Sequence, residues 1–126
     1  MALAFPDVEQ VLVAYLKDNL DGTYVSVKKA TPDTDPAPER QVVIAVGYNA
    51  EKDRVLRNAS LTVDCYALGY IEANDLALAV EYLLRQATVG PIKAVDVRVG
   101  PVRVSDESQY EKRSIDAGLV VKGYEL

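Results

Sequence analysis

Few residues in this chain have the types and spacing that catalysis or metal binding requires. The 126 residues include no histidine and one cysteine, Cys65. This excludes Ser-His-Asp and Cys-His nucleophilic sites, imidazole metal sites and an internal disulfide. Cys65 falls on the apolar side of an alternating segment, which favours a buried small hydrophobic residue over a reactive thiol. Acid–base chemistry would therefore depend on carboxylates, lysine or tyrosine.

One group of carboxylates has the spacing to bind a cation. Asp33, Asp35 and Glu39 lie close together in a segment that holds three prolines between residues 31 and 39. Oxygen ligands of this kind suit hard cations. The segment lacks the glycine turn and the terminal glutamate of an EF-hand loop, so a solvated loop is the simpler interpretation. We also expect this loop to be mobile in an isolated subunit and to become ordered on contact with a partner.

A second group could form the paired acids of a hydrolase, namely Asp64 with Asp96 or with Asp116. Paired acids need a cleft that raises the pKa of one carboxyl group. The alternating pattern instead places Asp64 and Asp96 on the polar side of their strands. No glycine-rich segment has the spacing of a phosphate-binding loop. The sequence therefore predicts no catalytic residue, no cofactor and no metal site.

Tyrosine is the residue type that most suggests an interaction surface. Eight tyrosines stand beside one phenylalanine and no tryptophan. Tyrosine combines apolar area with a polar tip and is enriched at protein interfaces. The other interpretation is that these are ordinary half-buried sheet residues. The candidate contacts with other subunits or partners are Pro32, Asp35, Pro36, Tyr48, Tyr66, Tyr70, Arg103, Tyr110 and Arg113, with the segments 31–40, 48–57 and 105–113 around them.

The elements that must position these residues follow from the apolar periodicity. Spacings of three and four predict two helices, and alternation or short apolar runs predict five strands. We expect the run 41–47 to be a central strand that is covered on both faces. Gly100-Pro101 should interrupt its strand as a bulge or a bend. The predicted helices span about 6–19 and 71–87, and the predicted strands span 23–28, 41–47, 58–67, 95–104 and 114–124.

The order α-β-β-β-α-β-β predicts a two-layer α+β fold, with a mostly antiparallel sheet and two helices packed on one face. The length fits one domain over residues 1–126. The matched periods of helix and strand predict a core shared by the second helix and the sheet. The predicted helix 6–19 adds a further apolar stripe. The predicted core residues of the second helix and the sheet are Leu61, Val63, Cys65, Leu76, Val80, Leu83, Val97 and Leu119.

Composition narrows the function classes further. The formal net charge is −5, without the basic excess or stripe that nucleic-acid binding requires. No apolar run approaches the ~20 residues that span a bilayer, so we expect no membrane association. The apolar segment Met1-Ala2-Leu3-Ala4-Phe5 is too short for a signal peptide and lacks its basic flank. The sequence indicates an acidic domain without catalytic equipment.

The order of features along the chain resembles the tail terminator, or tail completion, proteins of long-tailed double-stranded DNA bacteriophages, as found in phages of actinobacteria. The resemblance covers nearly the full length. The Gly-Pro segment after a valine strand, followed by a polar loop and a closing strand, is its most telling part. The matching segments are Phe5-Pro6-Asp7-Val8-Glu9, Leu20-Asp21-Gly22, the proline-rich loop before 42–47, the strand 59–67, Ala73-Asn74-Asp75-Leu76-Ala77 and Gly100-Pro101-Val102-Arg103-Val104-Ser105-Asp106.

This resemblance implies a virion structural protein that assembles as a ring, typically a hexamer. Such a ring caps the finished tail tube, stops its polymerisation and presents a surface to the head connector. It would sit at the head-proximal end of the tail after assembly in the host cytoplasm. Its partners would be its own copies, the tube protein and the connector or neck protein. DNA would pass through the lumen without sequence-specific binding, and a negative lumen would repel its phosphates.

Two other classes remain open. A head-closure or neck connector protein has a similar size and also lacks catalytic residues, and presence in a tail-only assembly would distinguish the two. A dimeric α+β ligand-binding module should instead have a concave apolar pocket with a few convergent polar groups.

Overall fold

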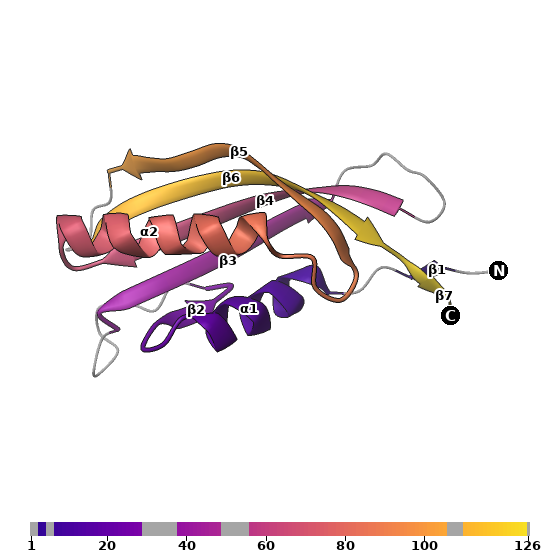
Figure 1. Ribbon diagram of the computed structural model, residues 1–126, viewed down its shortest axis with the longest axis horizontal. Coiled ribbons are helices and arrows are strands. Elements are labelled where there is room, and N and C mark those ends of the chain that lie inside the picture. Colours follow the sequence, from indigo (N-terminus) through magenta and orange to yellow (C-terminus); the bar gives the residue numbers. More distant parts are fainter. Residues whose placement is uncertain (1–2, 5–6, 29–37, 49–55, 106–109, 126) are drawn as a thin grey trace.

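The structure is a computed structural model that describes residues 3–4, 7–28, 38–48, 56–105 and 110–125. Two helices cover one face of a five-stranded sheet (Figure 1), and the predicted α+β class and the order α-β-β-β-α-β-β are confirmed. The elements are β1 (Leu3–Ala4), α1 (Val8–Asn19), β2 (Tyr24–Ser26), β3 (Arg40–Tyr48), β4 (Leu56–Ala67), α2 (Tyr70–Arg85), β5 (Ile92–Val104), β6 (Glu111–Lys122) and β7 (Tyr124–Glu125).

The strand order in the sheet is β2-β3-β4-β6-β5, so β2 and β5 are the outer strands. All neighbours run antiparallel except β2 and β3, which are parallel. The register forms straight rows across the sheet. One row joins Tyr24, Gln41, Tyr66, Lys112 and Val104, and therefore connects the first residue of β2 with the last residue of β5. The two ends of this row lie on opposite edges of the sheet.

Both helices begin and end where local chemistry favours it. The Asp7 carboxylate caps α1 by accepting a hydrogen bond from the Gln10 backbone N–H at 3.3 Å. Gly22 adopts a φ of +68° in the turn that follows α1, a conformation that glycine reaches without a Cβ clash. Glu72 lies in the first turn of α2 and Arg85 in its last, as the helix dipole favours.

The core lies between the helices and the sheet. Alternate residues of β4 and β6 point at α2, and α1 adds Val8, Leu12 and Leu16 against β2 and β3. Six of the eight predicted core residues are fully buried, including Cys65. Leu83 and Val97 are partly buried at the margin of the core, contrary to the prediction. Leu84, one position further along α2, takes the fully buried position.

The opposite face of the sheet is open, and this contradicts one prediction. The run 41–47 was expected to be covered on both faces, but Ala45 of β3 is exposed and Val43 is half-buried. Polar residues of the neighbouring strands continue this open face, including Thr62 and Ser114. The apolar run therefore belongs to a strand with one buried face. Its other face meets solvent, although the residues there are also apolar.

The predicted interruption of the fifth strand at Gly100-Pro101 is present as an irregular register. The register of β5 against β6 shifts between Val97 and Val99 and again between Val99 and Val102, around Gly100-Pro101. The shift keeps the three exposed valines of β5 opposite open-face residues of β6. Those valines are Val99, Val102 and Val104.

Several predicted boundaries move by a few residues. Helix α1 begins at Val8 and places Asp7 outside it as the cap. Strand β2 is three residues long, shorter than the predicted 23–28, and Val27 beyond its end is exposed. Strand β6 begins at Glu111, whereas the strand was predicted from residue 114, so the end of the segment 105–113 belongs to β6. The short pair β1–β7 was not anticipated.

Candidate assembly surface

The nine predicted contact residues fall into three groups. Pro32, Asp35 and Pro36 lie outside the described residues. So do Asp33 and most of the segments 31–40 and 48–57. Tyr48 ends β3, and the position of its side chain is not described. The remaining five divide between a buried tyrosine pair and a cluster at one end of α2. That cluster unites Tyr70, Arg103 and Arg113.

Tyr66 and Tyr110 lie inside the subunit rather than on its surface. Their rings meet edge to face with centroids 6.0 Å apart, and both residues are buried. The Tyr110 hydroxyl donates a hydrogen bond to the Pro38 carbonyl at 2.6 Å. The Lys112 ammonium lies 5.6 Å from the Tyr66 ring centroid. This pair joins the segment before β3 to the start of β6, so its role is structural.

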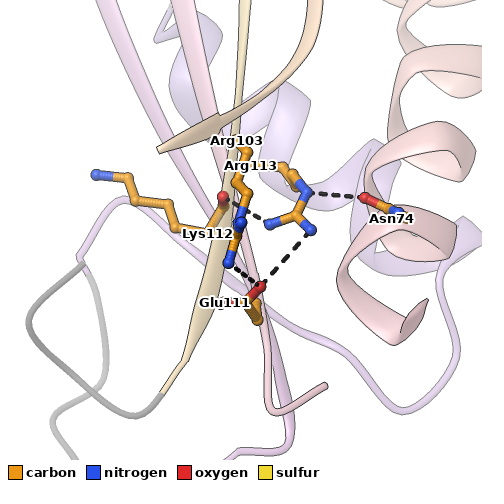
Figure 2. Close-up of polar contacts among 5 residues, drawn as sticks. All are labelled: Asn74, Arg103, Glu111, Lys112 and Arg113. Atoms are coloured by element: carbon orange, nitrogen blue, oxygen red, sulfur yellow. Dashed lines mark hydrogen bonds and ion pairs between the residues drawn. The ribbon is translucent and has the colours of Figure 1, made fainter. Parts of the chain in front are cut away.

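Arg113 is the central residue of the cluster. Its side chain is only 3% exposed. Arginine is almost never buried unless its guanidinium has partners. Its Nε donates to the Asn74 side-chain oxygen at 2.8 Å, and its Nη1 donates to the Lys112 carbonyl at 3.0 Å. The remaining nitrogen, Nη2, has no hydrogen-bond partner among the described residues. Figure 2 shows this guanidinium between β6 and α2.

A single carboxylate, Glu111, lies between two guanidinium groups. Its Oε1 is 3.2 Å from Nη2 of Arg103 and 3.8 Å from Nη2 of Arg113 (Figure 2). Both contacts are ion pairs, and the shorter one, to Arg103, is the stronger. The Tyr70 ring lies 4.8 Å from the Arg113 guanidinium carbon and 5.3 Å from that of Arg103, as cation–π contacts require.

The fold brings this cluster together through strand register. Arg103 on β5 is directly opposite Arg113 on β6, an arrangement that like charges disfavour unless a third group compensates. Helix α2 begins at Tyr70 and adds Asn74 one turn later. Arg113 is also opposite Cys65 on its other side. Burial, and then the nearby Asp64, raise the pKa of the Cys65 thiol to about 12, so Cys65 is neutral and supplies no negative charge.

Exposed apolar side chains form a second feature of the surface. On the outer strands they are Tyr24 of β2 and the three valines of β5. On α2 they are Ile71, Leu78 and Tyr82, each more than half exposed and spaced 7 and 4 residues apart along one side of the helix. The signal that could have revealed them is the presence of large apolar residues off the buried stripe of α2.

One cleft and two carboxylates bear on the alternatives of a ligand-binding module and a hydrolase. An open cleft of about 740 Å³ lies beside the start of α2, but Leu68 is its one large apolar lining residue, beside Gly22, Glu39, Arg40, Gly69 and Glu72. Asp64 pairs with Lys112 at 3.9 Å on the open sheet face, and Asp116 accepts a hydrogen bond from Thr62 there. Within the described part of the chain, no three acidic or cysteine residues converge as metal ligands.

Comparison with known proteins adds no family to this picture. No protein-family model matches the chain, and no curated protein matches it significantly. In the described ranges, neither helix has the length and apolar character needed to cross a membrane.

Proposed function

We propose that this protein is an assembly subunit that closes into a homo-oligomeric ring through its two sheet edges, and that the ring is the tail terminator of a long-tailed phage. The observation that supports ring closure is that the outer strands β2 and β5 have directions and register that allow them to pair between two copies. The sequence resemblance described above supports the identity of the ring. In this role the protein acts by contact alone and needs no cofactor.

The strand directions permit continuous extension of the sheet from one copy to the next. Strand β5 runs opposite to β6, and β2 runs parallel to β3, so β5 of one copy and β2 of the next would be antiparallel. Outer strands carry unpaired backbone N–H and C=O groups that can pair with another chain. The helices of both copies would stay on the same side of the extended sheet.

The register row identifies which residues would meet. Tyr24 and Val104 end the same row, and both are exposed apolar side chains at the two edges. Joining them would remove both from water, which favours association by ~25 cal/mol for each Å² of apolar area. Because the two patches differ, the contact is heterologous, and heterologous contacts close into rings when the rotation fits. The number six rests on the resemblance alone.

The surfaces left free by this contact serve the other partners. The exposed side of α2, with Ile71, Leu78 and Tyr82, provides apolar area for the tube protein or the head connector. The net charge of −5 suits a lumen through which DNA slides without binding. The completed ring would be located in the virion at the head-proximal end of the tail, after assembly in the host cytoplasm.

A cross-linking experiment tests the proposed edge contact. The full chain carrying both Tyr24→Cys and Val104→Cys would be treated with a short bismaleimide over a concentration series. The native Cys65 is buried and should not react. We expect a ladder of products that ends at a closed ring, six copies on the basis of the resemblance. Each single variant is the matched control and should remain uncross-linked, because a heterologous contact never brings two identical positions together.

Three outcomes would overturn the proposal. If Val104→Cys alone forms dimers and the double variant stops at dimers, the contact is isologous and the dimeric binding module is favoured. If the ladder forms but cryo-microscopy of purified tails shows no density for the protein at the head-proximal end, the ring is not a tail terminator. Presence in heads but not in tail-only assemblies would favour the neck connector instead.

A further inference from the structure

We propose that the Arg103–Glu111–Arg113 cluster receives a carboxylate from the C-terminal end of α1 in the neighbouring copy, supplied by Asp18 or Asp21. The incoming carboxylate binds Arg103, and Glu111 then turns to the buried Arg113. This inference rests on the ring proposed above, and it assigns the cluster a role in joining the subunits.

The first observation behind it is the unsatisfied nitrogen of Arg113. Its Nη2 is buried and lacks a hydrogen-bond partner among the described residues. A buried charged donor without an acceptor is destabilising, more so than a neutral one. The nearest carboxylate oxygen, Oε1 of Glu111, is 3.8 Å away because it is held by Arg103 at 3.2 Å. The isolated subunit therefore has an internal donor that a small movement of Glu111 would satisfy.

The second observation is the charge imbalance of the cluster. Among the described residues, two guanidinium groups share the single carboxylate of Glu111, and Cys65 beside Arg113 is neutral. A second carboxylate on Arg103 would give each arginine its own acidic partner. Arg103 can accept it without opening the core, because its side chain is 65% exposed while that of Arg113 is 3% exposed. The cluster in Figure 2 is thus accessible through Arg103.

The geometry of the edges indicates that the carboxylate comes from a second copy. Arg103 and Val25 end one register row, as Val104 and Tyr24 end the next. An antiparallel contact that joins Val104 of β5 to Tyr24 of the next β2 places Arg103 opposite Val25, and both residues face the helix layer. On that face α1 ends shortly before β2, and the exposed Asp18 and Asp21 lie in its last turn and in the turn that follows it. The negative end of the α1 dipole lies at the same place and also favours a cation.

The local structure of the donor segment fits this role. Asp18 lies in the last turn of α1, where the helix dipole disfavours a negative charge and a neighbouring cation would relieve it. The turn that carries Asp21 is held in place by Arg40, whose Nη2 donates to the Asp21 carbonyl at 2.7 Å. Both carboxylates are thus presented on a fixed support, which limits the entropy lost on contact.

A double-mutant cycle on the full chain tests the inference. The acidic end is neutralised by Asp18→Asn with Asp21→Asn, and the cluster by Arg103→Gln. Self-association is measured by native mass spectrometry and by the yield of the cross-linked ladder in the Tyr24→Cys, Val104→Cys background. We expect each change to weaken association about three- to tenfold, because ion pairs at interfaces are worth little more than exposed pairs when solvent reaches them. Combining them should cause no further loss.

Arg98→Gln is the matched control. Arg98 lies on the same strand, but its guanidinium rests over Gly118 on the open sheet face, away from the cluster. We expect it to leave association unchanged. Exchanging the charges, with Arg103→Asp and Asp21→Arg in one chain, should restore part of the lost association. The effect of Arg103→Gln should also shrink at high salt, where exposed ion pairs are screened.

The outcomes separate this inference from the proposed ring. A full ladder whose yield is unaffected by Arg103→Gln, or additive losses in the cycle, would overturn the carboxylate contact and leave the ring intact. Absence of any ladder in the parent chain would overturn both. Loss of association with Arg103→Gln but not with the two aspartate changes would mean that another partner supplies the carboxylate, and would equally refute the assignment to α1.

Discussion

Replacing Leu84 by alanine tests how α2 is seated on the sheet. Leu84 is fully buried, whereas Leu83, one position earlier, is only partly buried. Successive residues of an α-helix point about 100° apart, because one turn contains 3.6 residues. The two leucines therefore report the rotation of the helix about its axis, and each serves as the control for the other.

The expected loss follows from burial and from the space left behind. Leu84→Ala removes about three carbon atoms, and each buried methylene contributes ~0.8 kcal/mol, which gives about 2.4 kcal/mol. A residual void on the order of 50 Å³ adds about 1 kcal/mol, because the strands behind the helix cannot close it. The total is about 3–4 kcal/mol. Leu83→Ala should cost about half as much, since part of that side chain already contacts water.

Urea unfolding of both variants measures the difference. For a domain of this size the dependence of free energy on urea is about 1–3 kcal/mol per M, so Leu84→Ala should lower the midpoint by about 2 M and Leu83→Ala by about 1 M or less. The slope itself should not change. Equal losses, or a larger loss for Leu83→Ala, would refute the orientation of α2 on which the position of Tyr70 and Asn74 depends.

Two further predictions concern the Cys65 thiol and the Tyr15 hydroxyl. Burial raises the pKa of the Cys65 thiol from an ordinary value of 9.0 to about 12, so between these values unfolding releases a proton and the free energy of unfolding falls as pH rises. Cys65→Ala should make that fall shallower in urea titrations between pH 9 and pH 11; an unchanged slope would contradict the burial. The Tyr15 hydroxyl donates to the Leu83 carbonyl at 2.8 Å and joins the two helices. Tyr15→Phe should lower the free energy of unfolding by about 1 kcal/mol, and no loss would show that water replaces the bond.

Local periodicity was sufficient to predict the α+β class, the order of the elements and most of the core. The alternation from Ala59 to Ala67 identified the buried face of β4, because side chains of a strand point alternately to two sides. Spacing was less reliable at the ends of elements. It did not separate Leu83 from Leu84, because either residue fits an apolar stripe that is more than 100° wide.

The candidate surface could be predicted only in part. Tyr70, Arg103 and Arg113 were selected by residue type, but so were Tyr66 and Tyr110, which the fold buries against each other. Residue type indicates that tyrosine suits an interface, whereas exposure depends on what other segments cover. The apolar run of β3 likewise could not show that one of its faces meets water, because that depends on the number of layers in the fold.

The sequence by itself determined which residues belong to helices and strands and which side of each element is apolar, because those properties depend on neighbours within a few positions. The tertiary structure alone decided that Arg103 is opposite Arg113, that Glu111 lies between them, and that β2 and β5 are the outer strands. Strand order and register arise from contacts between residues that are distant in the chain. These contacts are selected by the packing of the whole core, and no local pattern encodes them.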